Sequence, residues 1–189
     1  MNKTLILYYS KYGTTKKYAE WIASALNGDM CAISDFKQNT LENYDTIIIG
    51  GGLYAGDIKG MDIILNNYQT LHGKKLVLFT CGLADYSKAE NINTIAGKIE
   101  AAIPENIRRD IKLYFLRGGI DYRRLSFKHK VMMALMKMIT ARKMKKGGDN
   151  AGEEVKEFLE MYGKNIDFTD KDNITGIVEY CKMEKQNDK

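Results

Sequence analysis

The sequence has little of several residue types on which particular protein classes depend. Among 189 residues there are one proline, two histidines and three cysteines, and Cys31, Cys81 and Cys181 lie far apart. This spacing excludes a disulfide framework and a zinc ribbon, and it suits a reducing cytosol. No apolar run approaches the roughly 20 residues of a membrane span, and the amino terminus enters a strand-like stretch at once, which predicts no signal peptide. The remaining balance of 44% hydrophobic and 28% charged residues is typical of one globular domain over 1–189.

Acidic residues are missing from one long stretch. Between Tyr122 and Gly148 there is no Asp or Glu, but there are nine Lys and Arg residues and half of the ten methionines. The whole chain has 29 basic and 24 acidic residues, net +5, so the rest of it has 20 basic and 24 acidic residues, net −4. The sequence therefore predicts a mildly acidic body with a basic, Met-rich insert at 122–148. Nucleic acid is disfavoured as a partner, because the insert lacks interleaved aromatic residues and the body is negative.

Short apolar runs alternate with helical patterns over the first 116 residues. Near-continuous apolar runs fit strands that are covered on both faces of a parallel sheet. Between them, apolar residues recur at three- and four-residue steps, as on one face of a helix. This alternation predicts right-handed βαβ units and a doubly wound α/β sheet. The five predicted strands lie at 5–9, 30–34, 46–49, 76–81 and 111–116.

The pattern changes after the fifth strand. The basic insert follows, and then an acidic helix is predicted around 155–162. A last helix is predicted to follow Thr169-Asp170, a suitable N-cap, and to end in a polar tail at 182–189. His72 is expected to be a helix cap or a surface residue. The separated histidines and scattered cysteines argue against a metal site.

Ligands of an open parallel sheet bind beyond the carboxyl ends of its strands. The segment after the first strand combines hydroxyl residues and a glycine with a helix start, which favours an anion cradle and, above all, phosphate. The alternative is a plain turn capped by Thr14. The residues of this first loop are Ser10, Lys11, Tyr12, Gly13, Thr14 and Thr15.

Two further loops follow the third and fourth strands. Four glycines within seven positions of the second loop, 50–57, imply positive φ angles or a close approach of the backbone to a ligand. Each loop also has small residues and one tyrosine, so the two could hold a flat aromatic ligand between them; the alternative is that Tyr54 and Tyr86 only cover the sheet end. The candidate residues are Gly52, Leu53, Tyr54, Ala55, Gly56 and Asp57 in the second loop and Cys81, Gly82, Leu83, Ala84, Asp85 and Tyr86 in the third.

These three loops, in this order, resemble the FMN site of the flavodoxin family. Ser10, Gly13 and Thr15 fall on that family's phosphate-loop pattern, and Tyr12 replaces a usual hydroxyl residue. Gly56-Asp57 stands where the family has a Gly-Asp pair whose peptide can turn to hydrogen-bond the reduced flavin. The resemblance covers nearly the whole chain. It implies a five-stranded parallel sheet in the order 2-1-3-4-5, with a helical insert after strand five, and FMN as the cofactor.

A subgroup of that family, which includes menaquinone-dependent protoporphyrinogen IX oxidase, is the closer match. Its members end strand five in a Gly-Gly or Gly-Ala step and then carry a basic, Met-rich insert, as this chain does from Gly118-Gly119 onward. The resemblance implies an FMN-dependent oxidoreductase in the cytoplasm or at the inner face of the membrane. It assigns no catalytic acid or base. A plain electron carrier that docks to redox proteins, and a flavin-free interaction module, remain as alternatives.

The insert allows several partners. If 126–146 is helical, Phe127, Val131, Leu135 and Met138 share one side, and basic residues crowd both ends. Such a stretch can lie in a membrane interface, receive an anionic small molecule or a quinone, or pack on the sheet or on a second subunit.

Overall fold

The computed structural model describes residues 3–54, 57–147 and 153–183. They form two compact units: the sheet unit, which comprises 1–118 and 168–189, and the insert unit, Gly119–Asp167. The insert predicted at 122–148 lies within the second of these. No helix in the described ranges combines the length and the apolar character that crossing a membrane requires.

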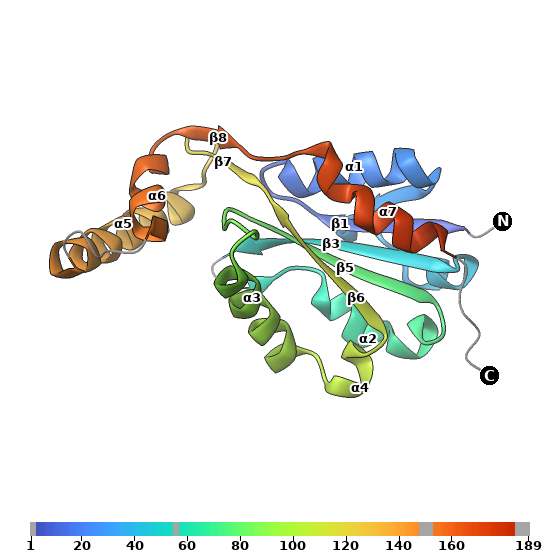
Figure 1. Cartoon of the computed structure of the whole chain (residues 1–189). Coiled ribbons are helices and arrows are strands. Elements are labelled where there is room, and N and C mark those ends of the chain that lie inside the picture. The colour runs from blue at the N-terminus through green and yellow to red at the C-terminus, as the bar shows by residue number, and fades with distance from the viewer. Residues whose placement is uncertain (1–2, 55–56, 148–152, 184–189) are drawn as a thin grey trace. The chain divides into compact units, whose positions relative to one another are not determined.

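The centre of the sheet unit is a five-stranded parallel sheet in the order β2-β1-β3-β5-β6 (Figure 1). This is the predicted order 2-1-3-4-5, because the short strand β4 pairs only with β3 and in the antiparallel sense. The strands are β1 Thr4–Tyr9, β2 Asp29–Ala32, β3 Thr46–Tyr54, β4 Asp57–Ile58, β5 Lys75–Gly82 and β6 Ile111–Arg117.

Helices cover both faces of this sheet, so alternate strand residues enter two separate cores. Leu5 and Leu7 of β1 pack with α2 and α3 on one face, whereas Ile6 packs with α1 and α7 on the other. This explains why the strands are apolar without interruption. The helices are α1 Thr14–Leu26, α2 Met61–Leu71, α3 Ala89–Ala102, α4 Glu105–Arg108 and α7 Thr175–Lys182, with 3₁₀ turns η1 Ile33–Asp35, η2 Gln38–Asn43 and η4 Lys171–Ile174.

The predicted cap at Asp170 starts a 3₁₀ turn that precedes the last helix, and α7 itself begins at Thr175. The Asp170 carboxylate accepts a hydrogen bond from the Asp172 N–H at 3.0 Å and so caps η4, which leads into α7. At the other end of α7, the buried Lys75 ammonium donates to the backbone carbonyls of Tyr180, Cys181 and Met183. Residues 184–189 of the predicted tail lie outside the described residues.

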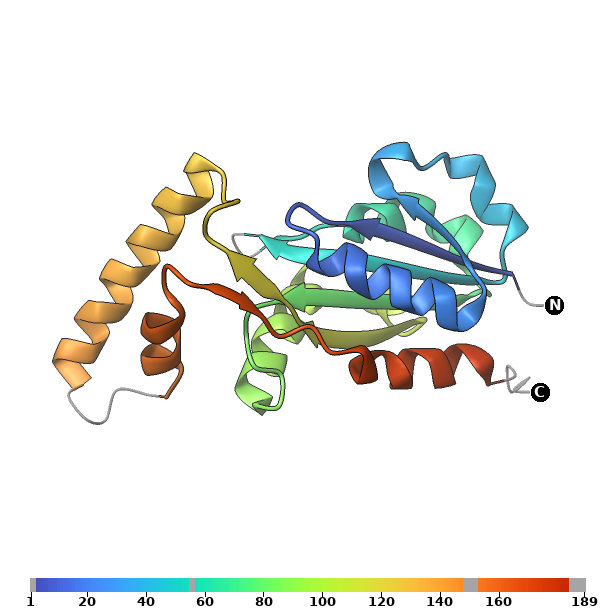
Figure 2. The same ribbon diagram turned by 90° about the horizontal axis from the view of Figure 1, so that it is seen from above.

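The insert unit consists of a two-stranded ladder and two helices. β7 Gly119–Asp121 pairs antiparallel with β8 Asn165–Asp167, and α5 Phe127–Gly147 packs beside α6 Glu153–Met161 (Figure 2). These confirm the predicted helix in the basic stretch and the acidic helix after it. Among the described residues of this unit, Ile120, Leu125 and Met133 are buried, and the rings of Tyr122 and Tyr162 meet edge to face with their centroids 5.1 Å apart.

Candidate functional site at the carboxyl ends of the strands

The turn between β1 and α1 ends in a helix N-terminus that no side chain caps. Gly13 is the N-cap residue, and its φ of 102° is a left-handed value that favours glycine. Its N–H donates to Ser10 Oγ at 3.1 Å, which closes the turn. The alternative of a cap by Thr14 is wrong, because Thr14 is the first residue of the helix. The first N–H groups of α1 therefore lack intrahelical acceptors, and no acidic residue competes in the first turn, so this end suits an anion.

A second observation at the same place favours a phosphate ligand. The Thr15 side chain is buried (1% exposed), and its Oγ1 has no hydrogen-bond partner among the described residues. A buried hydroxyl without a partner costs about 1–3 kcal/mol, which a ligand oxygen would recover. Lys11 and Lys16 are exposed on either side of this turn and supply positive charge. The first loop thus fits the phosphate of FMN.

The ends of β3, β5 and β6 meet at the same edge of the sheet as this turn. A methyl group built on Gly82 would stand 2.6 Å from the Tyr86 hydroxyl and 2.8 Å from Leu53 Cδ1. One built on Gly118 would stand 2.8 Å from Cys81 Sγ and 3.3 Å from Thr14 Oγ1. The structure therefore brings residues of all three predicted loops together.

The glycine-rich segment begins as a strand, which corrects the prediction of a loop from residue 50 onward. Gly50, Gly51 and Gly52 continue strand β3, which ends only at Tyr54, and none of the three has a positive φ. The close approach is to the chain itself: a methyl group on Gly50 would stand 2.2 Å from Phe79 Cζ, and one on Gly51 would stand 2.0 Å from the Lys59 carbonyl oxygen.

The Gly-Asp pair on which the resemblance to flavodoxins depends falls at the connection between β3 and β4. Ala55 and Gly56 lie outside the described residues, and Tyr54 pairs with Asp57 across the ladder. The contact of Gly56-Asp57 with a flavin ring remains a prediction.

The third loop is held by its own polar groups. Asp85 accepts hydrogen bonds from the N–H and the hydroxyl of Ser87, and the Ser87 N–H keeps the pKa of this carboxyl below its ordinary value. Tyr86 packs inward on Phe115, with ring centroids 5.9 Å apart, and burial raises the pKa of its phenol. That position favours the alternative in which Tyr86 covers the sheet end.

Arg117, the last residue of β6, is a part of this edge that was not predicted from the sequence. Its Nε donates to the Leu83 carbonyl at 3.3 Å, and its guanidinium stacks 3.8 Å from the centroid of the Phe168 ring. Lys17 Nζ likewise donates to Thr169 Oγ1 at 2.6 Å. Arg117 could have been predicted, because it ends a parallel strand and ligands bind beyond the carboxyl ends of such strands. Phe168 and Thr169 follow the insert, and no sequence pattern places them at this edge.

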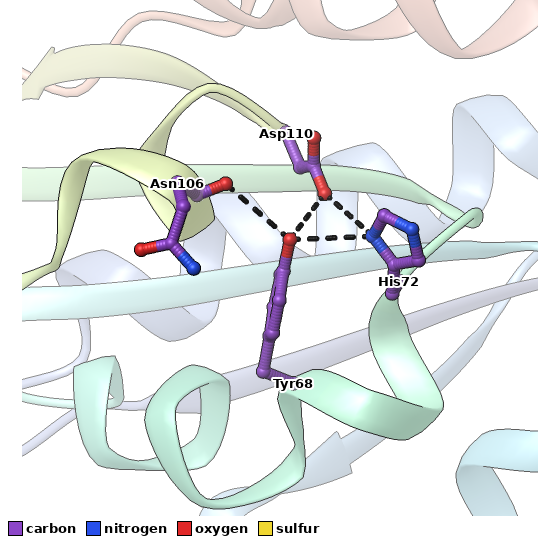
Figure 3. Close-up of polar contacts among 4 residues, drawn as sticks. All are labelled: Tyr68, His72, Asn106 and Asp110. Carbon is purple, nitrogen blue, oxygen red and sulfur yellow. Dashed lines mark hydrogen bonds and ion pairs between the residues drawn. The ribbon is translucent and has the colours of Figure 1, made fainter.

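His72 lies at the opposite edge of the sheet. It is the exposed C-cap residue of α2, as expected, and its Nδ1 is 2.9 Å from Asp110 Oδ2 (Figure 3). The Tyr68 hydroxyl donates to the same oxygen at 2.7 Å, and this hydrogen bond raises the pKa of the phenol. The cluster ties α2 to the start of β6. Across the described residues, no three His, Cys, Asp or Glu side chains are grouped to hold a metal ion.

Comparison with known proteins shows the family to which the chain belongs. Residues 5–147 match the flavodoxin-domain family, and the chain belongs to that family.

An uncharacterized protein of Methanocaldococcus jannaschii is 35% identical over 82 residues. This match covers 42% of this chain and 55% of the relative, so the chain spans about half the length of the curated relative.

Solved structures resemble the fold at low identity. General stress protein 14 of Treponema denticola, solved in complex with FMN, is 12% identical, with a TM-score of 0.46 over 62% of this chain and 87% of that one. Flavodoxin 2 of Bacillus cereus is 21% identical, with a TM-score of 0.39 over 61% and 82%. A flavodoxin from the domain Archaea is 16% identical, with a TM-score of 0.41 over 65% and 87%.

Proposed function

We propose that this chain binds FMN at the carboxyl edge of its sheet and transfers electrons to a redox partner protein. The observation that carries the proposal is the uncapped start of α1 beside the buried, unpartnered hydroxyl of Thr15. Membership in the flavodoxin-domain family supports the same cofactor. When bound, FMN supplies the one- and two-electron redox chemistry.

The chain's own residues hold and orient the cofactor. The N–H groups of Thr14, Thr15 and Lys16 would donate to phosphate oxygens, and the Thr15 hydroxyl would add a further hydrogen bond. Leu53, Gly82 and the turn of Leu83–Asp85 would border the ring, because they lie at the carboxyl ends of β3 and β5, the two strands that follow β1 in the sheet. Arg117 would keep the third loop in place through the Leu83 carbonyl.

The first test is FMN binding by the full chain. Binding to the purified protein should quench the fluorescence of FMN. The change Thr15→Val should weaken the affinity for FMN by roughly 10- to 100-fold, which corresponds to the loss of one hydrogen bond to a charged group. Thr94→Val is the matched control, because Thr94 is an exposed helical threonine on α3. An unchanged Kd for Thr15→Val would contradict the assignment of the FMN phosphate to the first loop. A protein that retains no FMN after reconstitution would contradict the proposed function.

A quinone-linked activity is the second candidate. It is favoured by the basic, Met-rich helix α5, whose apolar side chains are largely exposed and could receive a greasy acceptor. Reduced holoprotein should then be reoxidised by a menaquinone analogue in detergent and not only by a one-electron acceptor such as cytochrome c. Reoxidation by cytochrome c alone would leave the protein an electron carrier. The same assay with protoporphyrinogen as reductant tests the porphyrin reaction.

A further inference from the structure

Helix α5 has apolar side chains on two opposite faces, and the insert unit buries only one of them. Met133 is 6% exposed and faces the interior of the unit. At 100° per residue, five other apolar residues fall within an arc of about 120° centred opposite Met133. These five form the α5 strip, and their exposed fractions are Phe127 83%, Val131 44%, Leu135 51%, Met138 44% and Ile139 52%.

Such a row is too large to be an accident of surface composition. A lone exposed apolar side chain is ordinary, but a contiguous apolar patch marks a surface that binds something. The α5 strip extends over about 18 Å of helix, three turns and more. Because the five residues belong to one helix, the strip is continuous, and the partner that covers it must present an apolar surface of similar length.

The charges around the strip identify the chemistry of that occupant. Helix α5 contains seven Lys and Arg residues and no Asp or Glu. On the same face as the strip, the exposed Lys128 lies at its amino end and the exposed Arg142 and Lys145 lie at its carboxyl end. Long basic side chains at both ends of an apolar row can reach anionic groups while the row itself is buried.

We propose that α5 lies in the surface of an anionic phospholipid bilayer, with the strip among the acyl chains and Lys128, Arg142 and Lys145 at the headgroups. Basic side chains that flank an apolar row are attracted to anionic headgroups, while the row gains free energy by burial among the acyl chains. A second copy of the chain fits poorly, because strip-to-strip contact would bring two α5 helices together that each have seven cations and no acidic residue of their own. This inference does not depend on FMN, and it concerns residues outside the candidate cofactor site.

The test uses the full chain and sedimentation with vesicles. It should bind vesicles that contain phosphatidylglycerol at least about tenfold more tightly than vesicles of phosphatidylcholine alone. Leu135→Gln with Ile139→Gln should weaken binding at least about tenfold, because two buried aliphatic side chains are lost from the acyl region. The matched control is Leu65→Gln, since Leu65 is a 39% exposed leucine on α2 of the sheet unit.

A charge series separates lipid headgroups from general stickiness. Lys128→Gln, Arg142→Gln and Lys145→Gln together should abolish the preference for phosphatidylglycerol. The same number of changes at the exposed Lys98, Lys112 and Lys171 should preserve it. Circular dichroism checks that each variant retains its helices.

Several outcomes would overturn the proposal. These are no binding to either vesicle, equal binding to both, or an equal loss in the Leu65→Gln control. Sedimentation equilibrium that shows a dimer abolished by the Leu135 and Ile139 changes would assign the strip to a second copy. Retention on poly-L-glutamate without vesicle binding would assign it to an acidic protein.

Discussion

Gly50 occupies a position in β3 that has no room for a side chain. The ring of the fully buried Phe79 fills the space in which a Cβ would stand, and Gly51 is closed in the same way by the Lys59 carbonyl. Glycine in the middle of a strand weakens it, so its use here indicates close packing between neighbouring strands. At the scale of single residues, the close contacts with Phe79 and Lys59 thus explain why glycine is needed at positions 50 and 51.

The change Gly50→Ala should destabilise the protein by about 2–3 kcal/mol. A methyl group 2.2 Å from Phe79 Cζ forces the ring or the strand to move, which is the cost of overpacking. Urea denaturation followed by circular dichroism measures the loss.

Gly97→Ala is the matched control for this prediction. Gly97 lies on α3, has nothing within 4 Å of a built Cβ, and should gain up to about 1 kcal/mol from the better helix propensity of alanine. Equal effects of the two changes would contradict the explanation of Gly50.

At the scale of elements, α7 depends on a lysine from the middle of the chain. Lys75 begins β5, is 6% exposed, and directs its ammonium to three carbonyls at the end of α7. The last carbonyls of a helix carry partial negative charge, so a buried cation there is stabilised by the same groups that it satisfies. This contact joins two segments that lie far apart in the sequence.

The change Lys75→Met should cost about 2–3 kcal/mol, because the carbonyls at the end of α7 lose a charged donor. Hydrogen exchange should show the loss first in α7 and only later in β3 and β5. In contrast, Lys98→Met alters an exposed lysine of α3 and should stay within about 0.5 kcal/mol. A uniform loss of protection over the sheet unit would contradict a local role for Lys75.

The sequence predicts most of the elements, and the misses have local causes. Apolar runs and periodicity predict all five parallel strands and helices α1, α2, α3 and α7. The signal is strongest for the central strands β1, β3 and β5, because helices cover both of their faces. Strands β4, β7 and β8 have two or three residues each, which is too short for a periodic pattern. The predicted end of β3 falls too early because glycine, usually a loop signal, is required there by the packing of Phe79.

Only the part of the candidate site that has a local sequence pattern could be predicted. The first loop could be found because a helix start leaves a recognisable pattern of hydroxyl residues and glycine around Gly13. The positions of Arg117, Phe168 and Thr169 depend on a return of the chain after the insert, which no local pattern encodes.

At the scale of the whole molecule, the insert unit leaves and re-enters the sheet unit at adjacent residues. The Phe168 N–H donates to the Gly118 carbonyl at 3.0 Å, and within the insert unit Gly119 pairs with Asp167. A segment with such close ends can be removed without stretching what remains.

Replacing Gly119–Asp167 by a short glycine linker should therefore leave a folded sheet unit. Its FMN affinity should stay within about threefold of the full chain, a difference below about 1 kcal/mol, while binding to phosphatidylglycerol vesicles should be lost. Fluorescence titration and vesicle sedimentation measure the two properties. A second deletion variant, which keeps β7 and β8 and joins Asp121 to Asn165 by a turn, controls for the linker. Loss of FMN binding in both would show that the insert unit contributes to the cofactor site.

The same adjacency of Gly118 and Phe168 affects the order in which the protein folds during synthesis. Helix α7 completes one core of the sheet unit through Ile177 and Cys181, but it leaves the ribosome only after the whole insert, Gly119–Asp167. Closing an unstructured loop of roughly 50 residues costs about 2 kcal/mol more than closing a connection of about four residues. Folding of the insert unit, with β7 paired to β8, brings the two ends of this loop together and offsets the closure cost by the unit's own packing. An insert unit that folds first therefore lowers the entropic cost of docking the final helix.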